Sequence, residues 1–209
     1  MKDRFEDWII FEDENILAIN KPSGIASLDE RNIELPSIIK FARRYFADIQ
    51  LCHRIDKETS GILLMAKNPE SYREISMAFE DRQVEKIYHA IVEGAVKFEE
   101  LVVNLPIFVG KKARVRIDMR QGKEASTLFQ SLEIFRNFTL IECMPITGRM
   151  HQIRIHLQSQ NVPIVADLLY GGHLPYLSRY KRNFNIRKFE EEKPMINRFA
   201  LHAYSLFLQ

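Results

Sequence analysis

Apolar and polar residues alternate along several stretches of the chain, and this alternation predicts β-strands. The strictest stretch is 86–92, where positions 87, 89 and 91 carry Ile, His and Ile and positions 88, 90 and 92 carry Tyr, Ala and Val. A continuous apolar run at 62–66 predicts a buried strand. Less regular patterns predict further strands at Trp8–Phe11, Ile16–Asn20, Leu101–Leu105, Ala113–Ile117, Ser126–Phe135, Phe138–Met144 and Leu201–Leu208.

Three segments have sequence features of helices. Ser37–Phe46 carries an apolar stripe, and 148–160 predicts a helix that ends near Asn161, ahead of a proline. Asn68-Pro69-Glu70 predicts a helix start, because Asn caps a first turn and Pro suits its first position. The strands at 126–135 and 138–144 are separated by two residues, which predicts a hairpin. Many strands and few helices, with a long polar connection at 171–198, make the predicted fold class α+β.

Two polar segments next to predicted strands have the composition of tight turns. In Lys21–Gly24, Pro fixes φ and Gly permits positive φ, but the Gly-Lys-Ser/Thr order of a phosphate-binding loop is missing. His53–Gly61 places Arg54 and Asp56 two residues apart, just before the apolar run. This is the pattern of a polar loop that is anchored on a buried strand. Taken alone, such a pair more commonly pins a turn.

Five segments, in order along the chain, resemble motifs of the RluA-type RNA pseudouridine synthases. His53–Gly61 resembles the HRLDxxTSG signature of that family, and Thr147–Leu157 resembles its TGRxHQIRxHL motif. The other matches are Phe11–Gly24 with its NKPxG turn, the second-motif residues Phe79, Arg82, Val84, Lys86, Tyr88 and Ala90, and the LHAY segment Ala200–Tyr204. On these motifs the chain is identified as a member of the family over nearly its whole length.

The resemblance implies a mixed, largely antiparallel β-sheet with flanking helices and a central RNA-binding cleft, built as one catalytic domain over residues 1–209. It implies an isomerase that flips specific uridines out of structured ribosomal or transfer RNA and converts them to pseudouridine. That reaction requires no cofactor and no metal, and we expect a monomer whose partner is RNA. Many family members carry an N-terminal S4-type domain and continue beyond the LHAY strand. We therefore expect no S4 domain here, and either a C-terminal truncation or a differently built sheet edge.

The resemblance assigns the chemistry to Asp56, Tyr88 and Arg154. Asp56 could attack C1′, add to the uracil ring or remove a proton from C2′, and all three routes stay open. Each route needs an ionised carboxylate, which a nearby cation favours. The motif match gives that role to Arg154, with Arg149 as the second candidate. Tyr88 would hold the flipped uracil by stacking, and a core tyrosine is the alternative.

Other residues of the matched motifs are expected to contact the RNA. Arg54 would fill the gap that the flipped nucleotide leaves, although it could equally stabilise the backbone. Lys86 and Arg82 would bind phosphate or form local ion pairs. Ile62 and Leu63 would form the apolar floor of the site.

The composition is that of an ordinary globular protein, with 209 residues, 46% hydrophobic, 28% charged and a net charge of +2. Positive charge nevertheless gathers in two segments, and one of them interleaves it with aromatics. Such segments suit phosphates and unpaired bases, whereas solvated loops are the alternative. The segments contain Lys111, Lys112, Arg114, Arg116 and Arg120, and then Arg179, Lys181, Arg182, Arg187 and Lys188 with Tyr176, Tyr180, Phe184 and Phe189.

The remaining features indicate a cytoplasmic protein without a metal site. Cys52 and Cys143 stand among apolar residues and are expected to be buried thiols. No apolar run is long enough to span a membrane, and the charged N-terminus is unlike a signal peptide. His151 and His156 are five residues apart, which suits neither a helical metal pair nor one face of a strand. We expect them to make structural hydrogen bonds.

Two other functions compete with the isomerase. A catalytically silent RNA-binding module on the same fold would not need Asp56, Tyr88 and Arg154 together. A hydrolase that releases the base commonly uses two carboxylates or a metal-bound water, whereas one candidate Asp is found here without an obvious partner. A binder would give no product, and a hydrolase would give free uracil.

Overall fold

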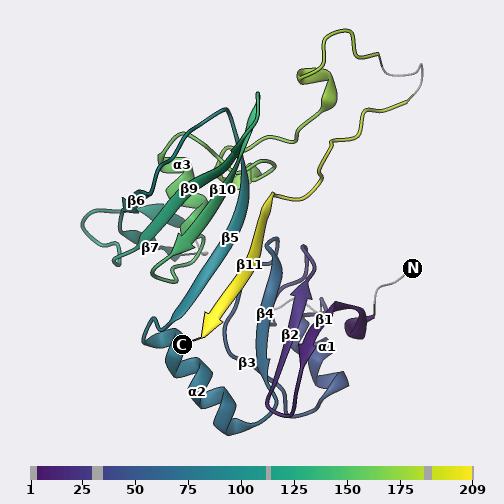
Figure 1. The fold of residues 1–209 in the computed structure, drawn as a ribbon, viewed down its shortest axis with the longest axis vertical. Helices are drawn as coiled ribbons and strands as arrows, with labels where there is room; N and C mark the ends of the chain where they lie inside the picture. Colours follow the sequence, from purple (N-terminus) through teal and green to yellow (C-terminus); the bar gives the residue numbers. More distant parts are fainter. Residues whose placement is uncertain (1–3, 30–34, 112–113, 186–189, 209) are drawn as a thin grey trace. The chain divides into compact units, whose positions relative to one another are not determined.

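The chain folds into two compact units that meet in sequence at Tyr88 and His89 (Figure 1). A computed structural model describes residues 4–29, 35–111, 114–185 and 190–208. The first unit extends to Tyr88 and takes up the chain again from His202, and the second covers His89–Leu201. The expectation of one catalytic domain stays a prediction.

The first unit is a sheet with strand order β1-β2-β4-β11-β5, in which β3 pairs with β4. The pairs β1–β2, β2–β4 and β3–β4 are antiparallel, whereas β4 and β11, which lie side by side in Figure 1, are parallel. Its elements are η1 (Phe5–Trp8), β1 (Ile9–Glu12), β2 (Ile16–Lys21), α1 (Ile38–Tyr45), β3 (Gln50–Leu51), β4 (Ser60–Ala66), α2 (Pro69–Glu80), the first half of β5 (Val84–Glu93) and β11 (Leu201–Leu208).

Alternation along β2 and β4 divides the core of the first unit between the two faces of its sheet. Successive strand residues point to opposite faces, so odd and even positions join different clusters. The cluster on the α1 side contains Phe5, Leu17, Ile19, Ile38, Ile39, Ala42, Ile49, Ile55, Leu63, Met65 and Ala203. The cluster on the α2 side contains Ala18, Cys52, Leu64, Ala66 and Ile75. Each large side chain buried in this way contributes about 1.5–3 kcal/mol.

The helix signals of the first unit are confirmed. The Asn68 side chain accepts a hydrogen bond from the backbone N–H of Ser71 at 2.9 Å, and Pro69 is the first residue of α2. Ser37 caps α1 through the N–H of Lys40. The strand predicted from Trp8 begins one residue later, because Trp8 ends a 3₁₀ turn that Asp7 closes by accepting from the N–H of Arg4 at 2.9 Å.

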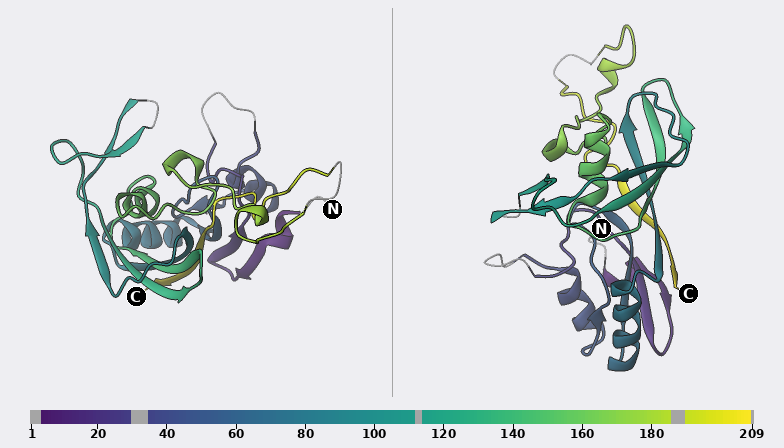
Figure 2. Two further views of the ribbon diagram at one scale, coloured as in Figure 1. Left: turned by 90° about the horizontal axis from the view of Figure 1, so that it is seen from above. Right: turned by 90° about the vertical axis from the view of Figure 1, so that its left-hand side faces the viewer.

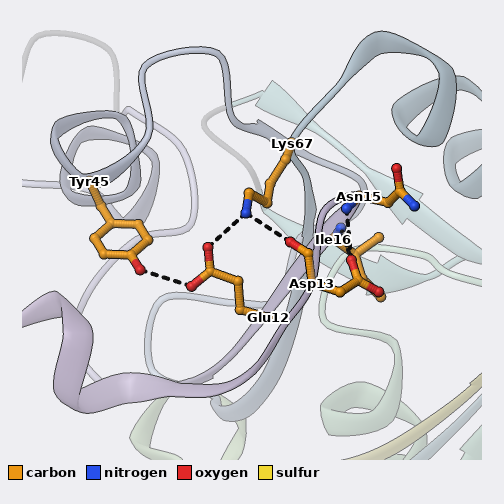
Figure 3. Close-up of polar contacts among 6 residues, drawn as sticks. All are labelled: Glu12, Asp13, Asn15, Ile16, Tyr45 and Lys67. Atoms are coloured by element: carbon orange, nitrogen blue, oxygen red, sulfur yellow. Dashed lines mark hydrogen bonds and ion pairs between the residues drawn. The ribbon is translucent and has the colours of Figure 1, made fainter.

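A polar cluster ties the acidic turn between β1 and β2 to the rest of the first unit (Figure 3). Glu12 accepts from the Tyr45 hydroxyl and from Lys67 Nζ, each at 2.8 Å, and Lys67 Nζ also donates to the Asp13 carbonyl at 2.8 Å. The bond from Lys67 lowers the pKa of Glu12, and bonds from the N–H groups of Ile16 and Asn15 lower the pKa of Asp13. These acids therefore serve the fold of the turn.

The second unit has the strand order β5-β10-β9-β6 and a separate hairpin of β7 and β8. The predicted hairpin of β9 and β10 is confirmed, and the N–H of Phe135 donates to the Phe138 carbonyl at 2.8 Å. The β7–β8 hairpin projects from the remainder of this unit (Figure 2). The elements of the second unit are the second half of β5, β6 (Leu101–Asn104), β7 (Ile107–Val109), β8 (Val115–Ile117), β9 (Ser126–Ile134), β10 (Phe138–Pro145), α3 (Gln152–Ser159), η3 (Leu168–Tyr170) and η4 (Leu177–Arg179).

The helix predicted from Gly148 begins four residues later, at Gln152. His151 adopts a left-handed φ of 54°, which interrupts helical geometry. The Gln152 side chain also accepts from Thr147 Oγ1 at 2.6 Å and from the N–H of Arg149 at 2.9 Å, so it orders the preceding turn. The predicted end is confirmed, since Asn161 has φ of 60° just after the helix.

The predicted α+β class with a largely antiparallel sheet is confirmed. The predicted RNA-binding cleft stays a prediction. Within the described ranges, no helix has the length and apolar character that a membrane span requires. Of the residues in the two basic segments, Lys112, Arg187, Lys188 and Phe189 lie outside the described part of the chain, as does Ala113 of the strand predicted at 113–117.

Candidate active site

The loop that carries Asp56 joins β3 to β4 and is fixed at its centre by the backbone of Lys57. The Lys57 carbonyl accepts from the N–H of Gly24 at 2.9 Å and from Lys21 Nζ at 2.9 Å. The N–H of Thr59 donates to the Asp56 carbonyl at 3.1 Å and closes a turn around the loop. The Asp56 side chain is half-buried at this turn. The two turn segments that the sequence singled out are thus bonded to each other.

Lys21 is the fixed point of this arrangement, and its side chain is fully buried. Its ammonium donates to the carbonyls of Pro22 and Ile25, each at 2.8 Å, in addition to Lys57, so three acceptors match its three donors. Burial lowers the pKa of Lys21 to about 8, and the negative charges of Glu58 and Asp56 oppose that shift. Sequence reasoning gave this residue only a turn role. The signal was available, because position 21 continues the inward alternation of Leu17 and Ile19.

The end of the loop is shaped by a close approach between β4 and β11. Gly61 has φ of 112°, and a Cβ on it would lie 2.1 Å from the carbonyl oxygen of Ala203. Next to it, Ser60 Oγ and His202 Nδ1 are 2.9 Å apart. The Thr-Ser-Gly and Leu-His-Ala-Tyr motifs are therefore one structural feature, and only glycine fits at their contact.

Tyr88 stands near Asp56 within the first unit. Its ring packs against the buried cluster on the α1 side, which includes Ile55. Burial raises the pKa of the Tyr88 hydroxyl, and the negative charge of Asp56 raises it further. Tyr88 therefore stays protonated at neutral pH, and its hydroxyl can donate a hydrogen bond. The packing also matches the alternative of a core tyrosine.

The side chain of His53 anchors the start of the loop to β4. Its Nε2 accepts from the N–H of Leu64 at 3.0 Å, and its ring stacks on Phe79 with centroids 4.5 Å apart. Burial, together with the positive charge of Lys86, lowers the pKa of His53 to about 3. The imidazole is neutral at physiological pH and acts as an acceptor.

The residues expected to contact RNA from the first unit differ in exposure. Arg54 and Arg82 are exposed, and Arg82 has a left-handed φ of 60°. Burial and the positive charge of Arg82 lower the pKa of Lys86. Ile62 is half-buried and Leu63 is fully buried in the cluster of the α1 side. Neighbours on a strand point to opposite faces, so these two do not form one floor.

Arg154 is buried in the second unit and is paired with Asp167. Its Nε and Nη2 donate to the two carboxylate oxygens of Asp167, each at 2.7 Å. The guanidinium carbon lies 4.8 Å from the ring centre of Tyr170 and 4.7 Å from that of Phe199. Sequence reasoning missed Asp167. The available signal was a single acid inside the apolar run 162–169.

Other predicted residues of the second unit have structural partners. Arg149 Nε donates to the Glu124 carbonyl at 2.9 Å. The expected hydrogen bonds of the two histidines are confirmed, since His151 Nδ1 lies 2.9 Å from the Tyr170 hydroxyl and His156 Nδ1 lies 2.9 Å from Thr127 Oγ1. The structure thus brings Asp56 and Tyr88 together in the first unit, and Arg149 and Arg154 belong to the second.

The remaining sequence predictions concern the two thiols and the two basic segments. Both cysteines are buried as predicted, and burial raises the pKa of Cys52 to about 12, so this thiol is no nucleophile at neutral pH. Arg116 pairs with Asp118 at 2.8 Å and lies 4.4 Å from the ring centre of Phe108. Tyr180 packs edge-on against Phe138 with centroids 4.9 Å apart, so this aromatic has a packing role.

Comparisons with known proteins identify the family of the chain. Residues 15–159 match the family described as RNA pseudouridylate synthase. Over 182 residues the chain is 40% identical to "Ribosomal large subunit pseudouridine synthase C" of Rickettsia bellii, covering 83% of this chain and 60% of that protein. It is 35% identical over 206 residues to "Dual-specificity RNA pseudouridine synthase RluA" of Vibrio parahaemolyticus, covering 95% of this chain and 76% of that protein.

A solved structure has the same fold over the whole chain. The structure of "Human RNA Pseudouridylate Synthase Domain Containing 1" superposes with a TM-score of 0.74 at 25% identity, covering 100% of this chain and 81% of the human one. The similarity therefore includes both units. The chain spans about 60% of the length of the Rickettsia relative.

Proposed function

Because the chain belongs to the RNA pseudouridylate synthase family, we propose that it isomerises uridine to pseudouridine in RNA. One observation supports this most strongly. Asp56 is half-buried on a loop that the buried Lys21 ammonium fastens to a second turn, and its negative charge helps to raise the pKa of Tyr88. A reacting carboxylate needs a fixed position and a partly dry environment, and these contacts supply both.

The reaction exchanges one glycosidic bond for another. The N1–C1′ bond breaks, the uracil turns, the C5–C1′ bond forms, the proton on C5 passes to solvent, and N1 gains a proton. Asp56 acts in the first half by attack at C1′, by addition to the ring or by removing a proton from C2′. Tyr88 holds the detached uracil by its ring face, and its hydroxyl stays protonated close to the carboxylate.

The resemblance gives Arg154 the role of the cation that favours an ionised Asp56, with Arg149 as the less favoured candidate. This part of the proposal rests on the motif match, because Asp56 belongs to the first unit and Arg154 to the second. Arg54 would occupy the gap left by the extruded nucleotide, and Arg82 with Lys86 would face a phosphate. The neighbouring charges of Arg82 and Lys86 support that last role. Ile62 is proposed to touch the uracil from the start of β4.

We propose large-subunit ribosomal RNA as the first substrate to test. The relative with 40% identity is named for the ribosomal large subunit, and the 35% identical relative is named as having dual specificity. Transfer RNA is therefore the second pool. A monomeric state and a cytoplasmic location remain predictions.

The test follows tritium release from C5 of [5-³H]uridine in unmodified large-subunit ribosomal RNA and in unmodified transfer RNA. The wild type is expected to release tritium, and Asp56→Asn is expected to release none. Asp48→Asn, an exposed acid of the same unit, is the matched control and should keep full activity. Tritium release that survives in Asp56→Asn would overturn the catalytic assignment. Free uracil would identify a hydrolase, and RNA binding without product would identify a silent binder.

A further inference from the structure

The Arg154–Asp167 ion pair is almost completely enclosed, with side chains 8% and 2% exposed. Both carboxylate oxygens of Asp167 are used, through the Nε and Nη2 edge of the guanidinium. A pairing through that edge defines the plane of the guanidinium and directs its Nη1 end to the opposite side.

Two aromatic rings lie against the same guanidinium. The ring centres of Tyr170 and Phe199 are 4.8 and 4.7 Å from the guanidinium carbon, so contact with them restricts the movement of the group. The Tyr170 hydroxyl lies 2.9 Å from Nδ1 of His151, the residue just before α3. The ring is thus bonded to the start of the helix that carries Arg154.

The backbone of Asp167 is fixed independently of its side chain. Its N–H donates to the Ile164 carbonyl at 3.0 Å, and its carbonyl accepts from the N–H groups of Tyr170 at 3.1 Å and Gly172 at 2.9 Å. A Cβ on Gly172 would lie 2.0 Å from the Ile164 carbonyl oxygen, so the turn closes tightly around Asp167. The carboxylate is presented to Arg154 by a rigid turn.

An enclosed ion pair is a weak source of stability, because desolvating two charges offsets most of their attraction. Apolar residues of similar volume would hold α3 against η3 as well. What the ionic pair adds is a defined direction for a charged group that has little freedom to rotate.

We propose that Asp167 is a positioning residue that aims Arg154 in the pseudouridine synthase reaction. This inference rests on the proposed function. Asp167 touches neither the RNA nor the reacting atoms, and it acts only through the orientation of the guanidinium. Loss of that orientation should lower kcat and leave RNA binding unchanged, since a misplaced catalytic group costs rate rather than substrate affinity.

The test compares Asp167→Asn and Asp167→Glu with the wild type and with Glu99→Gln, a matched control in an exposed pair with Lys97 of the same unit. Single-turnover tritium release gives the rate, filter binding gives the RNA affinity, and circular dichroism gives the folded fraction at each temperature. Asp167→Asn is expected to lower the rate by about 100-fold, with RNA affinity within about threefold of the wild type. Asp167→Glu keeps a carboxylate and should recover part of that loss.

The outcomes separate this inference from the proposed function. A wild type that forms no pseudouridine would overturn both. An active wild type with an equally active, folded Asp167→Asn would overturn the positioning role alone. A rate loss that disappears at low temperature, where the variant is fully folded, would also overturn it, because Asp167 would then act only through stability. The same conclusion would follow if both Asp167 variants stayed unfolded at every temperature.

Discussion

Replacing Lys21 by Met should destabilise the protein and loosen the loop that carries Asp56. The substitution keeps the length of the side chain and removes its ammonium, so the carbonyls of Pro22, Ile25 and Lys57 each lose a donor. A hydrogen bond to a charged group contributes about 1.5–3 kcal/mol, and three of them are lost. Burying the charge opposes this, since lowering the pKa from 10.5 to about 8 corresponds to about 3 kcal/mol. The net expected loss at neutral pH is about 1.5–6 kcal/mol.

The stability difference between the wild type and Lys21→Met should also depend on pH, in a direction that follows from the pKa of Lys21. The folded state has a Lys21 pKa of about 8 and the unfolded chain has one near 10.5, so the unfolded chain binds more protons between these values. The free energy of unfolding of the wild type should therefore rise, relative to Lys21→Met, as the pH increases from about 8 to about 10.5. Below that window the difference should be constant.

Urea denaturation across this pH range measures both effects. Lys40→Met is the control, because Lys40 is an exposed partner of Asp29 in the same unit and its loss should change stability little. Tritium release measured on the folded variants should show a lower rate for Lys21→Met alone. The reasoning would be refuted by a Lys21→Met protein within about 0.5 kcal/mol of the wild type at neutral pH, or by a difference that shrinks across the window.

Two further substitutions test the geometry of the first unit. Gly61→Ala places a Cβ 2.1 Å from the Ala203 carbonyl oxygen and should cost about 3 kcal/mol or more in urea denaturation. Gly24→Ala is its control, because its φ of 89° is also positive but the nearest atom to its Cβ would be Glu58 Oε2 at 4.0 Å. The loss there should stay at about 1 kcal/mol, and equal losses would contradict the close-approach argument. Asn68→Ala removes the cap of α2 and should lower the free energy of unfolding by about 1 kcal/mol, and an unchanged midpoint would show that Pro69 suffices to start the helix.

Local signals predicted the elements whose causes are local. The start of α2 follows from Asn68 and Pro69, whose effects act within one turn, and the β9–β10 hairpin follows from the two residues between its strands. The start of α3 failed for a different reason. The sequence predicts a helix from Gly148, but His151 adopts a left-handed backbone that its partner Tyr170, nineteen residues away in sequence, helps to hold. A contact of that kind has no signature in the local pattern.

The candidate site likewise has features that the sequence predicts and others that depend on residues far apart in the chain. The motif match named Asp56, Tyr88 and Arg154, but it gave no account of what holds them. Lys21 could be predicted to face inward from the alternation of β2, yet its acceptors include a carbonyl 36 residues away, which no periodicity reveals. In the sequence Asp167 is only an acid among apolar residues. Its partner Arg154 is thirteen residues away and is known only from the structure.

Lys21 and Asp167 lead to a common interpretation of the buried charges in this protein. Each is almost fully buried, each satisfies its hydrogen-bonding groups, and each is bonded to a residue or loop that the resemblance places in the chemistry. Buried charges are an inefficient way to stabilise a fold, because apolar groups of the same volume avoid the cost of desolvation. Their directional bonds, however, fix positions to within a fraction of an ångström, which packing of flexible side chains does less well. We therefore infer that these two residues are retained for the positions that they fix and not for stability alone. On this view Lys21→Met and Asp167→Asn should each reduce the rate by more than their loss of stability explains, whereas Gly61→Ala should reduce it only through the folded fraction.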